Sequence, residues 1–320
     1  MFFNNLLKWL ILMTILISFS TNSWFMYWLM MEMNLIFFIP IMNLKKKSNS
    51  NCMITYFITQ SFSSALFMIS MLNMSMTDMI LFNSLALISL MVKLAVIPFH
   101  FWLTNMSEMF DFKSLLLLLT LQKMIPLYIM SMLQTEFLIT FVVISATFAS
   151  IFVINLKAFK KILIFSSISH QSWIISLMIA KSNFWISYMI FYSFLIYKIT
   201  SFFFKMKCNN INTLTFQSQM YMNKISLCMM MMSLGGMPPF LGFFMKLISV
   251  IIMIKFNMML IVILIISSII NIFIYIRMIS PNLFLNLPNI KNFSTNELKM
   301  KNLILNVNLM VVIFLINFMN

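Results

Sequence analysis

The sequence has very few charged residues. Only 8% of its 320 residues are Asp, Glu, Lys or Arg, whereas 62% are hydrophobic, and the mean hydropathy is +1.01. An average soluble domain has about 25% charged residues, so this chain cannot cover a water-facing surface. Intrinsic disorder is excluded as well, because it requires low hydrophobicity. A polytopic membrane protein remains.

Cysteine, histidine and glycine are scarce too. The three cysteines, Cys52, Cys208 and Cys228, have no CxxC or other metal-binding spacing. The two histidines, His100 and His170, form no HxxxH pair, and the chain has no GxGxxG motif and no P-loop. We therefore expect no bound cofactor, metal or nucleotide in this chain.

The composition also indicates an AT-biased gene. The chain has 37 Met, 36 Phe and 20 Lys, but a single arginine, Arg277. Phe, Lys, Asn and Ile have AT-rich codons, and abundant Met indicates a second, AT-only Met codon, as in many animal mitochondria. An organellar gene is the favoured interpretation, and an AT-rich bacterium is the alternative.

The apolar residues form continuous runs, such as Leu115–Leu119 and Ile261–Ile266. A membrane β-barrel would instead alternate apolar and polar residues, so we expect an all-α fold of about eleven transmembrane helices. One helix needs about 20 apolar residues. The predicted spans are 3–20, 24–44, 53–73, 79–101, 114–133, 137–155, 162–180, 184–204, 224–248, 253–279 and 303–319.

Lysines gather in alternate loops of this prediction. They follow the even-numbered spans, as at Lys45–Lys47 and Lys113, and the opposite side has little beyond Lys181 and Lys255. The net charge of +15 is therefore explained by membrane topology rather than by nucleic-acid binding. By the positive-inside rule, the N-terminus and the even loops face the cytoplasm or the mitochondrial matrix, and Asn320 lies on the other side.

Two spans carry helix-breaking residues. All three glycines and a double proline fall within 235–242 of span nine, and Pro98 lies in span four. Because these spans are five apart, we predict two inverted five-helix repeats, each with a broken helix, an arrangement that marks an ion or substrate path. The predicted domains are 1–133, 134–280 and 281–320. Pro40 and Pro126 also lie in or near spans, so chance placement is the alternative.

Four ionisable residues stand inside predicted spans, where each costs about 2.5–3.5 kcal/mol on insertion scales. They are Glu32, Lys93, Lys123 and Lys246. A Glu–Lys pair beside a lone Lys suits a proton relay, because charge on one site changes the proton affinity of the next. The alternatives are that Lys93 or Lys246 reaches an interface, and that Glu32 is a structural hydrogen-bond partner.

Three further residues are weaker candidates for a part in proton transfer. His100 follows the break in span four and is a possible proton carrier or a packing residue. His170 lies in the hydroxyl-rich run Ser166–His170, which could hold water. Lys198 in span eight is apolar-flanked, and we interpret it as a residue that reaches an interface rather than as a working site.

Five motifs carry a resemblance to a known family. Lys93–Trp102 resembles the KLGxxPFHFW signature of the NADH–ubiquinone oxidoreductase chain 2 family, and Leu121–Leu127 resembles its WQKxAPL. Ser166–His170 is similar to YSSISH, and Leu234–Phe243 to LGGLPPFxGF, while Glu32 stands in a match to LEMNLxxFIP. The family often has Pro-Glu after PFHFW. This chain has Thr104-Asn105 there and Glu108 further on, which puts a role for that carboxylate in doubt.

The resemblance implies an antiporter-like, proton-pumping membrane subunit of respiratory complex I, in the mitochondrial inner membrane. It implies a Glu32–Lys93 pair, a central Lys123, and Lys246 toward the exit. The N-terminus would face the matrix and the C-terminus the intermembrane space. NADH, FMN, iron–sulfur clusters and ubiquinone would be bound by other subunits, and the partners would be other complex I membrane subunits and phospholipids. A stand-alone cation/proton antiporter and an assembly scaffold are the alternatives.

Overall fold

The part of the chain that the structure describes is almost entirely helical. This computed structural model describes residues 2–42, 50–73, 79–133, 137–206, 210, 221–238 and 240–284. The helices are α1 (Phe2–Ser20), α2 (Trp24–Met42), α3 (Ser50–Asn73), α4 (Met79–Leu94), α5 (Phe101–Met106), α6 (Phe112–Leu119), α7 (Leu121–Leu133), α8 (Leu138–Val153), α9 (Phe159–Ile179), α10 (Phe184–Met206), α12 (Tyr221–Gly235), α13 (Leu241–Met253) and α14 (Met258–Phe284).

Ten of the eleven predicted spans coincide with these helices, and the eleventh, 303–319, lies outside the described residues. Within the described ranges, seven helical stretches are long and apolar enough to cross a membrane, and four shorter apolar helices accompany them. The predicted all-α, polytopic fold is therefore confirmed.

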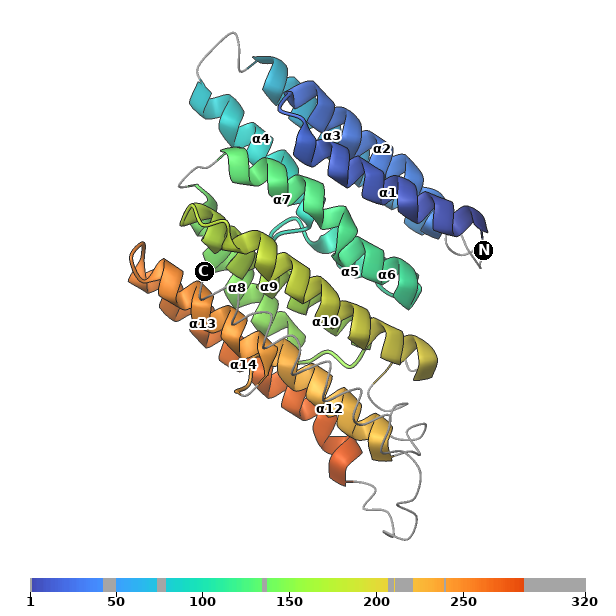
Figure 1. Cartoon of the computed structure of the whole chain (residues 1–320), viewed down its shortest axis with the longest axis vertical. Coiled ribbons are helices and arrows are strands. Elements are labelled where there is room, and N and C mark those ends of the chain that lie inside the picture. Colours follow the sequence, from blue (N-terminus) through green and yellow to red (C-terminus); the bar gives the residue numbers. More distant parts are fainter. Residues whose placement is uncertain are drawn as a thin grey trace.

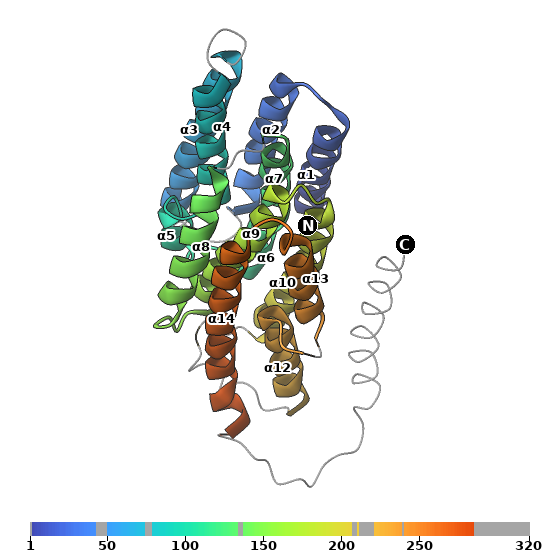
Figure 2. The same ribbon diagram turned by 90° about the vertical axis from the view of Figure 1, so that its left-hand side faces the viewer.

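The helices run side by side in one long bundle (Figure 1). Helices α1 to α7 form one end and α12 to α14 the other, with α9 and α10 between them, and a second view shows the same order (Figure 2). Helix α9 is the central element, since 94% of its most apolar 18-residue stretch is buried, against 28% for α1. Past Lys161 this helix has apolar and small hydroxyl-bearing residues on all its faces and no charged face, which suits such a position.

Helices α8 and α9 show how the sequence allows this close packing. Helix α8 packs against both α9 and α14 and carries the small residues Ser145, Ala146, Ala149 and Ser150, each of them at most 1% exposed. Small side chains let two helix backbones approach closely, which is how helices associate where no hydrophobic force drives them together. The hydroxyls are satisfied within α8, because Ser150 donates to the Thr147 carbonyl and Ser145 to that of Val142.

The two halves of the chain share one packing pattern. In the first half, α1 contacts α2 and α7, α2 contacts α3 and α7, and α4 contacts α3 and α7. In the second half, α8 contacts α9 and α14, α9 contacts α10 and α14, and α12 contacts α10 and α14. In each half these contacts close a ring of five elements, and the fourth element of each, α4 or α12, ends at a helix break.

Two details differ from the sequence prediction. Span five, predicted as continuous over 114–133, is interrupted at Thr120, which separates α6 from α7. The tenth span begins at Met258 rather than at residue 253, because Asn257 caps α14 by accepting hydrogen bonds from the backbone of Met259 (3.0 Å) and Leu260 (3.3 Å). Asparagine is a preferred N-cap residue. Asn257 could therefore have predicted the start of this helix, but the apolar residues before it extended the predicted span to residue 253.

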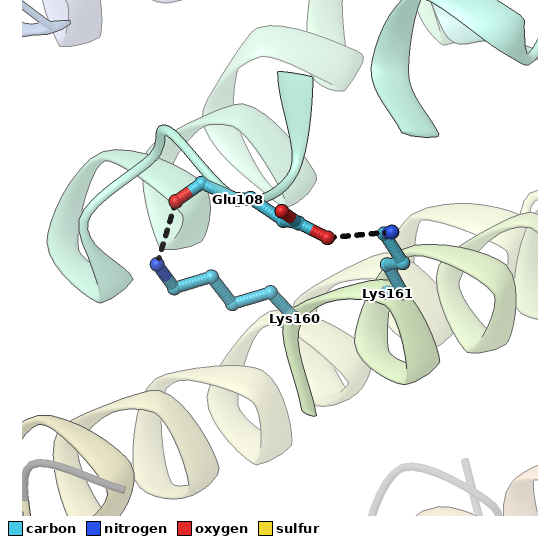
Figure 3. Close-up of polar contacts among 3 residues, drawn as sticks. All are labelled: Glu108, Lys160 and Lys161. Carbon is cyan, nitrogen blue, oxygen red and sulfur yellow. Dashed lines mark hydrogen bonds and ion pairs between the residues drawn. The ribbon is translucent and has the colours of Figure 1, made fainter. Parts of the chain in front are cut away.

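Glu108, in the loop before α6, joins this loop to the first turn of α9 through two lysines (Figure 3). Lys161 Nζ lies 2.6 Å from Glu108 Oε1, and Lys160 Nζ donates to the Glu108 carbonyl at 3.2 Å. Lys160 Nζ also lies 5.4 Å from the ring centre of Phe112. The loop before α6 is thereby tied to the start of α9, and Glu108 meets two lysines of the second half.

Gly242 lies where the start of α13 contacts the end of α12. A Cβ atom built on Gly242 would lie 1.8 Å from the carbonyl oxygen of Ser233 and 3.3 Å from the Cα atom of Gly236. These are backbone atoms, which cannot move aside as the end of a flexible side chain can. The contact between the two helix segments therefore requires glycine at position 242.

Replacing Gly242 with alanine should loosen this contact. We expect Gly242→Ala to destabilise the fold by about 1–3 kcal/mol, the usual cost of overpacking. The temperature at which the assembled complex is lost measures this change. Gly235→Ala is the matched control, because its Cβ would lie 3.1 Å from the side chain of Tyr275, which can shift. Equal losses for both variants would contradict the assignment.

Glu108→Gln should have a small, salt-dependent effect. Lys161 lowers the pKa of the Glu108 carboxyl below its usual range. The ion pair is therefore formed at pH values above that range and is lost only as the pH falls through the lowered pKa. The Glu108 side chain is 67% exposed, and such pairs are weak and screened by salt. Hydrogen-exchange protection of residues 107–111 should fall with added salt in the wild type but not in the variant. A change in protection between about pH 6 and 8 would refute this.

Candidate functional site

The first broken helix ends earlier than the proline alone predicts. Helix α4 stops at Leu94, Ala95 has a φ of 57°, and the helix resumes only at Phe101. Pro98 contributes by lacking a backbone donor. Exposed backbone at membrane depth is tolerated only where it is buried in protein or lines a cavity, so the partners of the α4 carbonyls define the site.

All four terminal carbonyls of α4 have donors. A helix normally leaves its last four C=O groups without partners. Two are satisfied locally and two by amide side chains of other helices, one from α3 and one from α9. The pairs are Val96 N to Met91 O (3.1 Å), Ala95 N (3.2 Å) and Trp102 Nε1 (3.1 Å) to Val92 O, Gln60 Nε2 to Lys93 O (3.5 Å), and Gln171 Nε2 to Leu94 O (3.2 Å).

The second broken helix uses glycine and lysine for the same purpose. Helix α12 ends at Gly235, and Gly236 has a φ of +81°, which glycine adopts without strain. Gly236 N donates to the Met232 carbonyl at 3.1 Å. From α13, Lys246 Nζ reaches back and donates to the Gly235 carbonyl at 2.6 Å. The predicted discontinuity of span nine is therefore confirmed.

Glu32 lies on α2 and Lys93 on α4, two helices of the first half that both pack against α3 and α7. Glu32, on α2, accepts a hydrogen bond from the Ser64 hydroxyl on α3. Lys93 is 9% exposed in the last turn of α4 and interacts electrostatically with Glu32. Within the described ranges the only ion pair shorter than 4.0 Å is Lys161–Glu108, so Glu32 and Lys93 are near one another without direct contact.

Lys123 is 3% exposed on α7, three residues after the interruption at Thr120. Its Nζ donates to Ser167 Oγ on α9 at 3.1 Å. The Ser167 hydroxyl in turn donates to the Ile164 carbonyl at 2.6 Å, so its oxygen is free to accept from the lysine. Lys123 therefore connects the first half to the central helix.

A small cavity lies between Lys93 and Lys123. Its volume is about 10 Å³, close to the least that holds one water molecule by the same measure. Such a water needs two to four polar partners, and the walls provide them. The lining residues are Tyr56, Gln60, Lys93, Leu94, Trp102, Leu103, Leu118, Gln122 and Lys123.

His170 lies within electrostatic reach of both Lys123 and Lys246. It is 7% exposed on α9, its Nδ1 is 2.9 Å from the Tyr188 hydroxyl, and both lysines interact with it electrostatically. His100 lies elsewhere, beside the rings of Phe152 and Phe165 with centroid distances of 5.8 and 5.7 Å. The structure thus brings His170 together with two of the predicted lysines but gives His100 an aromatic setting.

Lys198 and the cysteines play no part in this cluster. Lys198 Nζ lies 5.2 Å from the ring centre of Phe194 on its own helix. Cys52 and Cys228 are free, and the described residues contain no group of three or more His, Cys, Asp or Glu that could hold a metal ion. Cys208 lies outside the described residues.

Sequence reasoning missed the neutral polar residues that surround the lysines. Gln60 and Gln171 bind carbonyls of α4, and Gln122 Nε2 donates to Asn34 Oδ1 at 2.9 Å. Each is a lone amide that stands beside a serine or a lysine, which carries no periodic signal of its own. The only signal in the sequence was that these uncharged amides fall inside predicted spans, where a buried polar group normally has a hydrogen-bond partner.

Comparison with known proteins agrees with this geometry. The chain matches the family described as NADH:quinone oxidoreductase/Mrp antiporter, TM, over residues 21–274. It is 47% identical to NADH-ubiquinone oxidoreductase chain 2 of Rhipicephalus sanguineus over 97% of this chain and 98% of that protein. For the protein of the same name from Anopheles gambiae the identity is 32%, over 76% and 74%.

Solved structures show the same fold at low identity. A chain of respiratory complex I from Thermus thermophilus is similar with a TM-score of 0.79 and 17% identity, over 97% of this chain and 77% of that chain. A chain of the Mrp complex from Dietzia sp. gives a TM-score of 0.75 and 16% identity, over 88% and 61%. With its helical fold and its sequence matches taken together, the chain belongs to the NADH:quinone oxidoreductase/Mrp antiporter family of transmembrane proteins, among the members called NADH-ubiquinone oxidoreductase chain 2.

Proposed function

We propose that this chain is a proton-translocating membrane subunit of respiratory complex I. NADH oxidation and ubiquinone reduction take place in other subunits, which hold NADH, FMN, the iron–sulfur clusters and ubiquinone. This chain moves protons when the complex turns over. The 47% identity to a protein named NADH-ubiquinone oxidoreductase chain 2 supports this assignment over a stand-alone cation/proton antiporter, to which the Mrp likeness relates the fold alone.

One observation carries the proposal: the buried ionisable groups form a row through both halves. Glu32 lies within electrostatic reach of Lys93, Lys93 and Lys123 line one cavity of about 10 Å³, and Lys123 binds α9, where His170 lies within electrostatic reach of Lys246. Such charges are expensive in a bilayer and are kept where they carry ions or protons. A row of them is what proton transfer between neighbouring sites needs.

The roles within this row follow from position. The Glu32–Lys93 pair holds the proton at the first break, Lys123 passes it to the central helix, and Lys246 is the site toward the exit. His170 joins Lys123 and Lys246. His100 lies among aromatic rings outside the row, so it packs the first break and takes no part in transfer.

The repeated packing of the two halves supports a division into inverted repeats. We place the first repeat at 1–133 and the second at 134–280, followed by a C-terminal segment, 281–320. An odd number of helices per repeat reverses the second relative to the first, so the two broken helices enter from opposite sides.

The setting of the chain follows from the same family. We place it in the mitochondrial inner membrane, among other complex I membrane subunits and phospholipids and without a nucleic-acid partner. The exposed apolar side chains along α1 and α14, such as Trp9 at 64% and Ile269 at 59%, suit a lipid or subunit contact. The N-terminus faces the matrix and the C-terminus the intermembrane space.

Lys123→Met should stop proton transfer without preventing assembly. Methionine retains the apolar stem but has no proton to give, so we expect the pumping rate of the assembled complex to fall about tenfold or more, the scale on which loss of a proton-transfer group acts. Pumping is measured in vesicles alongside the amount of complex. Lys198→Met is the matched control and should pump normally. Normal pumping by the Lys123 variant would refute the relay.

The topology is tested with tags at the two ends. The lysines at 45–47 follow the second span, so the N-terminus and this loop should lie on the same side of the membrane. Both should be protected from added protease in mitochondria whose outer membrane has been opened and whose inner membrane is intact. A tag after Asn320 should be cleaved by added protease. Cleavage of both tags, or of neither, would contradict the eleven-span arrangement.

A further inference from the structure

Helix α3 carries a polar stripe although it has no Lys, Arg, Asp or Glu. Tyr56, Gln60 and Ser64 follow one another at intervals of four residues, which places them on one face of the helix. All three are buried, with exposed fractions of 2%, 7% and 0%. An apolar helix has no need of three buried polar groups in register, so their partners are informative.

Two members of the stripe bind the helices that carry Glu32 and Lys93. The Ser64 hydroxyl donates to the carboxylate of Glu32 on α2. One turn away, Gln60 Nε2 donates to the Lys93 carbonyl at the end of α4, at 3.5 Å. Helix α3 therefore holds Glu32 directly and holds the backbone from which the Lys93 side chain extends.

The third member binds the helix of the central lysine. The Tyr56 hydroxyl donates to Gln122 Oε1 on α7 at 3.3 Å, and Gln122 is the residue before Lys123. The other end of that amide donates to Asn34 Oδ1 on α2 at 2.9 Å, two residues after Glu32. The amide of Gln122 is thus fixed in one orientation between α2 and α3.

The stripe also forms a wall of the cavity. Tyr56, Gln60 and Gln122 line it together with Lys93 and Lys123. Three neutral polar groups therefore surround the space through which a proton would pass between the lysines, and they are tied to the three helices that carry the charges. A shift of α3 would change both lysine positions and the shape of the cavity.

The outward face of α3, beside Thr55, differs from this buried stripe. Thr55, next to Tyr56, is exposed, and its hydroxyl donates to the Cys52 carbonyl of the same helix at 3.0 Å. Ile54, Phe57 and Ile58 beside it are 55%, 48% and 56% exposed. The bonds that Tyr56, Gln60 and Ser64 make to other helices thus all come from the face that meets the relay.

We propose that Tyr56, Gln60 and Ser64 are positioning residues, which set the geometry of Glu32, Lys93 and Lys123 for proton transfer. This inference rests on the proposed function, since it assigns supporting residues to the same row of charges. The three side chains need not exchange protons themselves. They act by fixing the helices and the carboxylate on which the donor and acceptor groups are mounted.

The test compares Gln60→Met and Ser64→Ala with Thr55→Val in the assembled complex. Met matches the length of Gln but cannot donate, and Ala removes only the Ser64 hydroxyl. We expect the pumping rate to fall about threefold to tenfold in both, the scale of a small misplacement of reacting groups. The solvent isotope effect on pumping should rise about twofold as proton transfer becomes limiting. Thr55→Val should match the wild type in both measurements.

The isotope effect is a ratio and is unaffected by a reduced amount of complex, so a purely structural role would leave it unchanged. An unchanged isotope effect in Gln60→Met and Ser64→Ala would overturn the proposal, as would an equal rise in Thr55→Val. If the Gln60 variant fails to assemble, Tyr56→Phe, which loses one hydroxyl and keeps its ring contacts, decides by the same criterion.

Lys123→Met is measured in parallel to separate the two claims. If it pumps normally, the proposed relay fails and the positioning role falls with it. If it stops pumping while the α3 variants keep the wild-type rate and isotope effect, only the positioning role is wrong.

Discussion

The need to satisfy backbone carbonyls at two helix breaks governs the interior of this protein. An apolar surrounding offers no water to unpaired C=O groups, each of which would cost several kcal/mol. At the end of α4 the missing donors come from Gln60 and Gln171, and at the end of α12 from Lys246. The broken helices and the buried polar side chains are therefore one feature. Wherever the backbone is interrupted, neighbouring helices must supply donors, and those donors bring the polar surroundings in which a lysine can be accommodated.

Helix α9 serves both halves because a helix can present different residues to different neighbours. Ser167 and Gln171 are four residues apart, so they share a face, and they bind Lys123 and the Leu94 carbonyl of the first half. Ser169 lies on another face, where Asn271 of α14 donates to its hydroxyl at 3.1 Å. The serines bury at little cost, since each donates to a carbonyl three residues earlier in α9. A hydroxyl-rich central helix can thus be buried on all sides and still accept hydrogen bonds from both halves.

Much of this interior could be predicted from the sequence. The predictable residues are those whose cost of burial or backbone stiffness can be recognised without knowing their partners. A lysine in an apolar run and a double proline are recognisable from the sequence alone, so the burial of Lys123 and the break near 235–242 could be predicted. The interruption at Thr120 was not, because it carries neither glycine nor proline. Gln60 and Gln122 were missed because an amide is informative only once its partner is known, and their partners lie 33 and 88 residues away. Likewise, Pro98 indicated a break but not that α4 would end at Leu94, which depends on donors from α3 and α9.

The breaks also explain how two of the lysines, Lys93 and Lys246, can be buried here. An unbroken helix has no free carbonyls along its length, whereas a helix end carries roughly half a negative charge from the aligned peptide dipoles. Lys93 lies in the last turn of α4, and Lys246 reaches the last carbonyl of α12 from the following segment. Both lysines therefore meet the negative end of a helix, by two different routes. A partial charge of this kind favours the protonated amine less strongly than a full carboxylate would. A lysine held by a carbonyl at a helix end, as Lys246 is held by Gly235, can lose its proton without leaving an unpaired full charge on that partner, which is what the proposed relay requires of it.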